Sequence, residues 1–352
     1  MSDATTSTDD CIEVLDAHRF DEASLERYML ANVDGFAAPL SVQQFQGGMS
    51  NPTFKLTDGH GVSYVLRKKP PGNLLPSAHA VEREYRVISS LANTGVPVPQ
   101  TFVLCEDETV IGTAFYVMQH VIGRVFLDPS LPDLAPAERG AVYADKHRAL
   151  AALHSVDYRA VGLEGFGKPG EYCARQINRW TKQYVASKTD DLPDMDSLIK
   201  WLPDNLPTDD PVCIAHGDYR LGNMIFANDA PQVIAVLDWE LSTLGHPYAD
   251  LAYDCLAYHV PNLFRGDIAS KDLGALGIPN ESEYVEAYCK ARGLPEIPNW
   301  TFYVVLSLFR LAAITQGVYY RGLQGNASDP RALERRDNCQ RMSKIAWGLV
   351  TQ

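Results

Sequence analysis

Asp218, Asn223 and Asp238 have the residue types and the spacing that could serve phosphoryl transfer. Asp218 comes five residues before Asn223, and Asp238 follows fifteen residues later. Oxygen ligands suit Mg²⁺, which proteins hold with one or two carboxylates together with the phosphates of the substrate. Asn223 and Asp238 would supply those ligands, while the Asp218 carboxylate could accept a proton from an attacking hydroxyl. The plainer interpretation is that these side chains only stabilise turns.

A β-hairpin is expected to bring the two metal-ligand candidates together. Asn223 is followed by an apolar run at 224–226, turn-forming residues at 228–231 and a β-branched run at 233–237. Because a hairpin folds its two outer ends together, the side chains of Asn223 and Asp238 can share one small volume. The sequence therefore predicts a magnesium site at the open end of this hairpin.

The order of these residues is that of the kinases, in which a catalytic Asp, an Asn and a later metal-binding Asp follow one another. Here the segments read HGDYRLGN and LDWE. With these motifs the chain resembles the aminoglycoside phosphotransferase and choline kinase branch, the small-molecule relatives of protein kinases. The resemblance extends from about residue 40 to about residue 325. The stretches LRKKPPGNLLPSAHAVEREYRV, YVMQHVIGRVF and HGDYRLGNMIF are most similar to phosphotransferase domains associated with acyl-CoA dehydrogenases, and we expect no dehydrogenase chemistry.

This resemblance implies an α+β, bilobal protein-kinase-like fold that uses ATP and Mg²⁺. An N-terminal antiparallel β-sheet lobe with a helix would bind the nucleotide, and a mainly helical C-terminal lobe would carry the catalytic loop. Asp218 would orient and deprotonate the acceptor hydroxyl. Arg220 would neutralise charge on the transferred phosphoryl group, or else bind a carboxylate of the substrate. Asp250 resembles the family Asp that braces the catalytic loop.

A glycine-rich turn stands near the start of the predicted nucleotide lobe. Three antiparallel strands are expected there, at 40–46, 53–57 and 63–67. The turn between the first two strands contains Gly48, Ser50 and Asn51. Since glycine lets backbone N–H groups approach phosphate closely, we expect these residues at the nucleotide. A turn of this kind on its own is more often an ordinary hairpin.

Alternation along the third strand puts Val65 and Arg67 on one face of the sheet. That face would offer an apolar contact to adenine and a cation to the phosphates. The resemblance implies that this cation is Arg67, with Lys68 as the alternative. In kinases the cation pairs with an acid of the following helix, which we assign to Glu84, with Glu82 left open.

Gln119 and His120 would form the hinge, whose backbone faces the adenine edge. This places the boundary between the lobes near residue 120. The expected organisation is an N-terminal extension and helix at 1–36, a nucleotide-binding lobe at 37–119 and a catalytic, substrate-binding lobe at 120–352.

Helical spacing predicts the remaining elements. Helices are expected at 21–32, 78–91, 137–154, 172–187, 248–260, 282–291, 300–322 and 331–350. Acidic, proline-containing loops are expected between residues 190 and 210. The apolar run 302–314 is broken by Arg310 and is too short to span a bilayer, so it predicts a buried helix.

One further motif resembles a phosphate loop without qualifying as one. Residues 162–168 match the Walker A pattern up to its lysine, but Pro169 replaces the hydroxyl residue that would bind Mg²⁺. Proline also lacks the backbone N–H that a phosphate cradle uses. We interpret this segment as a loop.

The composition limits the partners of the chain. A net charge of −13 and a pI near 5.1 argue against nucleic acid and anionic membranes, which attract basic surfaces. The seven cysteines are scattered without a C-x-x-C pair, and the acidic start MSDATTSTDD is no signal peptide. A cytoplasmic location is expected, and a homodimer is left open.

Three interpretations of the activity remain. The acceptor of the phosphate could be the hydroxyl of a hydroxy acid or hydroxyacyl-CoA, or of a cationic alcohol such as an aminoglycoside or choline. Arg175, Arg179 and Lys182 would favour an anion, whereas an acidic wall at 190–196 would favour a cation. The third interpretation is a kinase-like protein that binds nucleotide without turnover.

Overall fold

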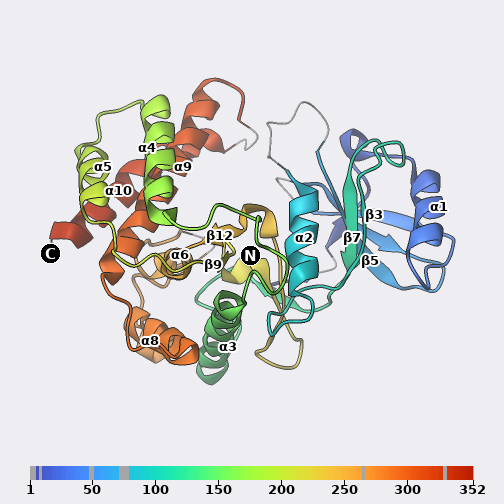
Figure 1. The fold of residues 1–352 in the computed structure, drawn as a ribbon, viewed down its shortest axis with the longest axis horizontal. Coiled ribbons are helices and arrows are strands. Elements are labelled where there is room, and N and C mark those ends of the chain that lie inside the picture. Colours follow the sequence, from blue (N-terminus) through green and yellow to red (C-terminus); the bar gives the residue numbers. More distant parts are fainter. Residues whose placement is uncertain are drawn as a thin grey trace. The chain divides into compact units, whose positions relative to one another are not determined.

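The computed structural model describes residues 5–7, 10–46, 51–70, 79–263, 266–327 and 331–351. Packing divides the chain into two compact units (Figure 1). The first unit consists of Met1–Leu127, Arg159–Leu163 and Leu221–Ser242. The second unit consists of Asp128–Tyr158, Glu164–Arg220 and Thr243–Gln352. This division differs from a single boundary near residue 120, because the hairpin after Asn223 packs with the N-terminal part of the chain.

The first unit is built on a six-stranded antiparallel sheet. Its strands, in spatial order, are β2 (Cys11–Ile12), β3 (Ser41–Phe45), β4 (Thr53–Thr57), β5 (Ser63–Lys68), β7 (Phe115–Gln119) and β6 (Thr101–Cys105). The three strands expected before residue 70 are therefore confirmed within one residue at each end.

Two helices cover opposite faces of this sheet (Figure 1). Helix α1 (Glu22–Asn32) begins at Asp21, whose carboxylate accepts a hydrogen bond from the Ser24 N–H. Its buried residues pack in the apolar core that includes Phe54, Leu66 and Phe115. Helix α2 (Val81–Leu91) contacts β6 and β7 from the other side. The sheet therefore has one face covered by an apolar core and α1, and one face that turns toward α2.

A second sheet of the first unit contains the expected hairpin. Its strand order is β1 (Thr5–Ser7), β8 (Arg124–Phe126), β10 (Met224–Phe226) and β11 (Val233–Val236). Phe226 pairs with Arg124, and the Val236 N–H donates to the Pro97 carbonyl. These bonds hold the hairpin in the first unit, although it lies a hundred residues later in the chain.

The second unit is mainly helical. Helix α9 (Trp300–Leu323) packs against the α4, α6 and α10 helices. The expected buried helix is confirmed, because 72% of its apolar window is buried inside the protein. The expectation that it is too short to span a bilayer is wrong, since α9 is long and apolar enough to cross one. The helices of this unit are α3 (Pro136–Ser155), α4 (Tyr172–Ser187), α5 (Pro193–Asp204), α6 (Pro247–Asp254), α7 (Leu273–Leu276), α8 (Glu281–Arg292), α9 and α10 (Asn338–Thr351), with β9 (Cys213–Ala215) paired to β12 (Thr243–Gly245).

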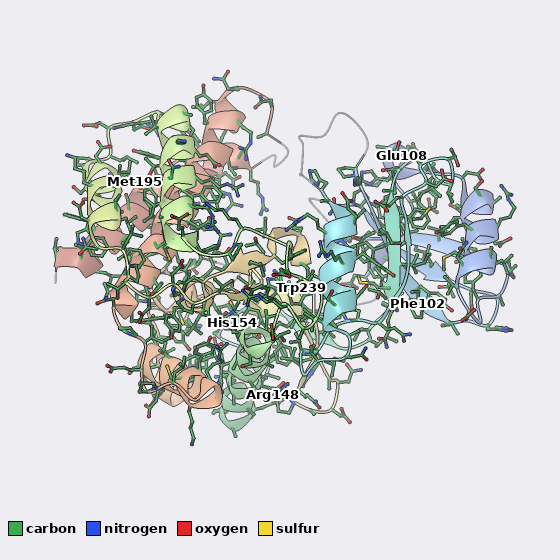
Figure 2. The ribbon with its side chains drawn as sticks, viewed as in Figure 1. Phe102, Glu108, Arg148, His154, Met195 and Trp239 are labelled. Carbon is green, nitrogen blue, oxygen red and sulfur yellow. The ribbon has the colours of Figure 1, made fainter. Side chains whose placement is uncertain are left out.

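Three expectations for this unit are wrong. The expected helix 248–260 is divided into α6, which ends at Asp254, and a 3₁₀ turn, Cys255–Tyr258. Helix α5 occupies part of the region expected to be acidic loops, because Met195, Leu198 and Leu202 form a fully buried helical stripe. Pro193 at its first turn is compatible with a helix start, and acids near that end interact favourably with the helix dipole (Met195 is labelled in Figure 2). The expected helix 331–350 is divided into a 3₁₀ turn, Ala332–Arg335, and α10.

Candidate functional site

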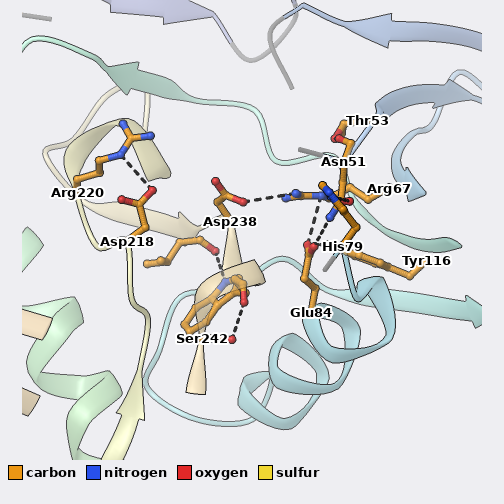
Figure 3. A network of polar contacts seen from close by, with 12 residues as sticks. Asn51, Thr53, Arg67, His79, Glu84, Tyr116, Asp218, Arg220, Asp238 and Ser242 are labelled. Carbon is orange, nitrogen blue, oxygen red and sulfur yellow. Dashed lines mark hydrogen bonds and ion pairs between the residues drawn. The ribbon is translucent and has the colours of Figure 1, made fainter. Parts of the chain in front are cut away.

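Arg67 is the charged centre of the candidate site in the first unit (Figure 3). Its Nε lies 3.3 Å from Glu84 Oε2, and its Nη2 lies 3.4 Å from Asp238 Oδ1. Only 11% of the Arg67 side chain is exposed, so these two carboxylates compensate a largely buried cation. Although burial acts to lower it, the carboxylates hold the pKa of Arg67 above its ordinary value. The expected pairing of Arg67 with Glu84 is confirmed.

The two neighbouring lysines, Lys68 and Lys69, do not contact Glu84. Because side chains alternate along β5, Lys68 points away from Arg67, and its ammonium lies 5.6 Å from the Phe20 ring and 5.7 Å from the Phe54 ring. Lys69 pairs instead with Glu82 at 3.0 Å. Of the cations considered from the sequence, it is therefore Arg67 that faces Glu84.

Glu84 receives donors from two further elements. Asn51 Nδ2 donates to Glu84 Oε1 at 2.7 Å, and the Tyr116 hydroxyl donates to Oε2 at 3.0 Å. Burial raises the pKa of Glu84 to about 7, against the opposing effect of the Arg67 guanidinium. Asn51 is itself buried and also contacts His79 Nδ1 at 3.1 Å. Its side chain thus holds Glu84, while the expected contact of this turn with phosphate, which would use backbone N–H groups, stays a prediction.

Asn223 and Asp238 stand at the open end of the hairpin. Met224 pairs with Val236, and the Leu237 N–H donates to the Asn223 carbonyl at 2.8 Å. This confirms the expected hairpin geometry. Asp238 adopts a left-handed backbone conformation, with φ 66° and ψ 58°. That conformation costs a non-glycine residue roughly 1–2 kcal/mol, and such strain is concentrated at functional sites.

The oxygen atoms at this end suit Mg²⁺ better than a metal ion whose ligands all come from the protein. Within the described residues, no group of three or more His, Cys, Asp or Glu side chains could hold a metal ion. Asn223 and Asp238 offer oxygen, and 35% of the Asp238 side chain is exposed. Mg²⁺ usually takes one or two protein oxygens and completes its shell with phosphates and water. Both residues therefore remain candidate ligands.

Of the other expected nucleotide contacts, the structure describes Val65, Gln119 and His120. Gly48 and Ser50 lie outside the described residues. Val65 is buried on the same face of β5 as Arg67. Gln119 ends β7, and its N–H donates to the Gln100 carbonyl at 2.7 Å, which leaves that hinge N–H engaged within the sheet. His120 is half-buried beside the Phe45 ring.

In the second unit, Asp218 is held at both carboxylate oxygens. The Tyr253 hydroxyl donates to Oδ1 at 2.8 Å, and Arg220 Nε lies 3.3 Å from Oδ2. The Asp218 side chain is 18% exposed and that of Arg220 is 32% exposed. Asp218 is thus fixed in position and still accessible, as a residue that accepts a proton from a substrate must be. Arg220 lies beside this carboxylate, and its expected role toward the phosphoryl group or a substrate carboxylate stays a prediction.

The expected brace of the catalytic loop is confirmed. Asp250 Oδ2 accepts from the His216 N–H at 2.7 Å, and Oδ1 accepts from the Gly217 N–H at 2.8 Å. His154 Nε2 lies 3.2 Å from Oδ2, which gives this buried histidine (labelled in Figure 2) a packing role. Burial acts to raise the pKa of Asp250, but these donors bring it below its ordinary value.

A row of cationic and aromatic side chains lies next to this loop in the second unit. The Arg310 guanidinium lies 5.0 Å from the Tyr253 ring and 5.9 Å from the Trp180 ring, and Arg179 lies 5.0 Å from the Trp180 ring. Arg310 Nη2 also donates to the Gly217 carbonyl at 2.8 Å, while its buried Nε has no hydrogen-bond partner among the residues that the structure describes. This row therefore carries positive charge close to Asp218.

The acidic segment 190–196 is partly neutralised. Lys188 Nζ lies 3.2 Å from Asp191 Oδ1 and 3.1 Å from Asp196 Oδ2. Arg175, expected to favour an anion, donates through Nη2 to the Lys168 carbonyl at 2.7 Å. Part of the expected acidic wall is thus the first turn of α5 and the residues before it, where Lys188 pairs with two of the acids.

Three residues that contact the candidate side chains were not recognised in the sequence: Tyr116 in the first unit, and Tyr253 and Arg310 in the second unit. Two of them left a signal. Tyr253 stands three residues after Asp250, which places both on one face of a helix. Arg310 interrupts an apolar run, and a charge on a buried helix requires partners.

The chain matches the model of the phosphotransferase enzyme family over residues 41–297. It is 48% identical, over 94% of its length, to mouse acyl-CoA dehydrogenase family member 10, and covers 31% of that protein. It is 50% identical, over 90% of its length, to chicken acyl-CoA dehydrogenase family member 11, and covers 42% of that protein. The chain thus spans less than half the length of these relatives.

Solved structures agree with this match. A protein from Ralstonia eutropha, provisionally named an aminoglycoside phosphotransferase, is 50% identical with a TM-score of 0.88, over 95% of this chain and 99% of that one. An aminoglycoside phosphotransferase in ternary complex with ADP and hygromycin B shares the fold, at 14% identity and a TM-score of 0.59, over 92% of this chain and 98% of that one. The expected kinase-like α+β fold is confirmed, and the chain belongs to the phosphotransferase enzyme family.

Proposed function

We propose that this phosphotransferase moves the γ-phosphate of ATP to a hydroxyl of a small molecule, with Mg²⁺ as cofactor. The observation that carries the proposal is the position of Arg67, which is paired at once with the helix acid Glu84 and with the candidate metal ligand Asp238. This cation–acid pair, next to a metal-binding Asp, is what kinases use to hold nucleotide phosphates. The solved complex of a family relative with ADP also supports a nucleotide substrate.

The chain's own residues have distinct tasks in this reaction. Arg67 would hold the nucleotide phosphates, and Asn223 and Asp238 would hold Mg²⁺. When bound, Mg²⁺ would offset the negative charge of the phosphates. Asp218 would orient the acceptor hydroxyl and take its proton while the hydroxyl oxygen bonds to the γ-phosphorus. The bond from that phosphorus to the β-phosphate oxygen breaks at the same time, and ADP leaves with its electron pair.

An acceptor with a negative group is the substrate class that we favour. Arg220 and Arg310 both contact the loop that carries Asp218, and Arg179 extends the positive charge along Trp180. A hydroxy acid or hydroxyacyl-CoA would complement these cations. A cationic alcohol, such as an aminoglycoside or choline, would meet repulsion there, and the acids of 190–196 are partly engaged with Lys188.

The test is ADP release from ATP and Mg²⁺ across a panel of alcohols. The panel contains hydroxy acids of several chain lengths, their coenzyme A thioesters, choline and aminoglycosides. We expect acceptor-dependent ADP release with anionic members, lost in Asp218→Asn while nucleotide binding persists. Release only with cationic members would contradict the substrate class. If the protein binds nucleotide but releases no ADP with any acceptor, the result would favour a kinase-like protein that binds nucleotide without turnover.

A further inference from the structure

Tyr253 makes a shorter contact to the Asp218 carboxylate than Arg220 does. Its hydroxyl donates to Oδ1 at 2.8 Å, whereas Arg220 Nε lies 3.3 Å from Oδ2. Tyr253 is buried, with 8% of its surface exposed. A buried donor held at this distance restricts the rotation of the carboxylate about its last bond. One oxygen of Asp218 is thereby assigned to Tyr253, and the other lies on the side of Arg220.

The position of Tyr253 is itself fixed from two directions. It lies on α6 three residues after Asp250, so one helix face carries both the brace of the loop backbone and the donor to the loop carboxylate. The Arg310 guanidinium lies 5.0 Å from the Tyr253 ring and donates to the carbonyl of Gly217, the residue before Asp218. Backbone and side chain of the loop are therefore held by the same small group of residues.

The hydroxyl of Tyr253 remains a donor. Burial raises the pKa of Tyr253 well above its ordinary value, and the nearby Asp218 charge raises it further. The tyrosine therefore stays protonated across the range in which enzymes work. It is not placed to remove a proton, but it can orient the group that does.

We propose that Tyr253 is a positioning residue for phosphoryl transfer, which fixes Asp218 through the hydrogen bond to Oδ1 and so aims Oδ2 at the acceptor hydroxyl. This rests on the proposed function. Correct aim of a catalytic group contributes to the chemical step more than to binding, because a misdirected base still leaves the substrate sites intact. The inference thus concerns kcat, not the affinity for either substrate.

The test compares Tyr253→Phe with wild type and with Tyr258→Phe. Both variants lose one phenolic oxygen, but Tyr258 donates to the Pro279 carbonyl and not to the catalytic loop. We expect Tyr253→Phe to lower kcat by about 10- to 100-fold, the usual effect of one hydrogen bond to a charged group, with KM for ATP and acceptor nearly unchanged. Tyr258→Phe should keep the wild-type kcat. Circular dichroism and thermal unfolding confirm that each variant is folded.

A double variant separates the positioning role from a general loss of structure. If Tyr253 acts through Asp218, Tyr253→Phe combined with Asp218→Asn should be no slower than Asp218→Asn alone. The positioning role alone would be overturned by an unchanged kcat in Tyr253→Phe or by an equal loss of kcat in Tyr258→Phe. It would also be overturned if the main effect of Tyr253→Phe were a rise in KM. Wild-type activity in Asp218→Asn would overturn the proposed function as well.

Discussion

Replacement of Asp250 by asparagine is the sharpest perturbation of the loop that carries Asp218. The change keeps the size of the side chain but turns one carboxylate oxygen into an NH₂ donor. Both oxygens are in use, since Oδ1 accepts from the Gly217 N–H and Oδ2 from the His216 N–H. His154 Nε2 also approaches Oδ2, so the amide oxygen is expected to occupy that position. The Gly217 N–H then faces another donor.

The magnitude follows from these contacts. A buried donor that loses its acceptor costs about 1–3 kcal/mol. The remaining bond changes from charge-assisted to neutral, which costs roughly another 1 kcal/mol. Asp250→Asn should therefore lower the free energy of unfolding by about 2–4 kcal/mol. Because the loop backbone shifts with Gly217, kcat should fall as well.

Denaturant unfolding followed by tryptophan fluorescence and far-UV circular dichroism measures this loss. The matched control is Asp21→Asn, the same chemical change at an exposed helix start where the carboxylate accepts from Ser24. Asparagine caps helices as well as aspartate does, so this variant should unfold like wild type. The reasoning is refuted if Asp250→Asn stays within about 0.5 kcal/mol of wild type, the range typical of unremarkable surface changes.

Three other perturbations test the remaining parts of the structure. Arg67→Met should lower kcat/KM for ATP by about 100-fold or more, as loss of an electrostatic contact to a reacting group does, whereas Lys68→Met should leave it close to wild type; equal losses in steady-state kinetics would count against the assignment. Leu198→Ala in α5 should cost about 2–5 kcal/mol in denaturant unfolding because that side chain is fully buried, while Leu206→Ala, 39% exposed, serves as its control. Burial lowers the pKa of His246 to about 4 from its ordinary 6.5, so the unfolded state binds the proton first and the free energy of unfolding should fall as pH drops through this window. The full loss in the free energy of unfolding is about 3 kcal/mol. If this free energy depends on pH as steeply in His246→Asn as in wild type, the assignment of the effect to His246 is contradicted.

Local patterns in the sequence predict the elements that carry the site. The hairpin after Asn223 follows from two apolar runs around a turn, and the faces of β5 follow from simple alternation. The pairing of Arg67 with Glu84 needed the resemblance to kinases as well, because alternation alone does not choose a partner on another element. These features depend on residues that are neighbours in the chain, or on the order of motifs that the chain shares with kinases. Both can be read from the sequence.

Features that depend on distant contacts were missed. One local pattern is also misleading: the acids around 190–196 favour loops, whereas the helical spacing of Met195, Leu198 and Leu202 forms α5 once these side chains are buried. The buried bond from the Asn51 amide to Glu84, 33 residues away, has no signal in the local sequence. Tyr253 and Arg310 reach the loop of Asp218 from helices that follow it in the chain. Nothing in their local sequence states which partner they meet.

The division of the chain also bears on its synthesis. Strand β8 is made by residue 126, but its neighbour β10 begins only at Met224, so one edge of that sheet lacks its partner while the intervening chain is translated. At about 5–20 residues per second the wait lasts roughly 5–20 s. A nascent chain arrested before residue 224 should therefore present an open strand edge that a chaperone, or another nascent copy, can occupy.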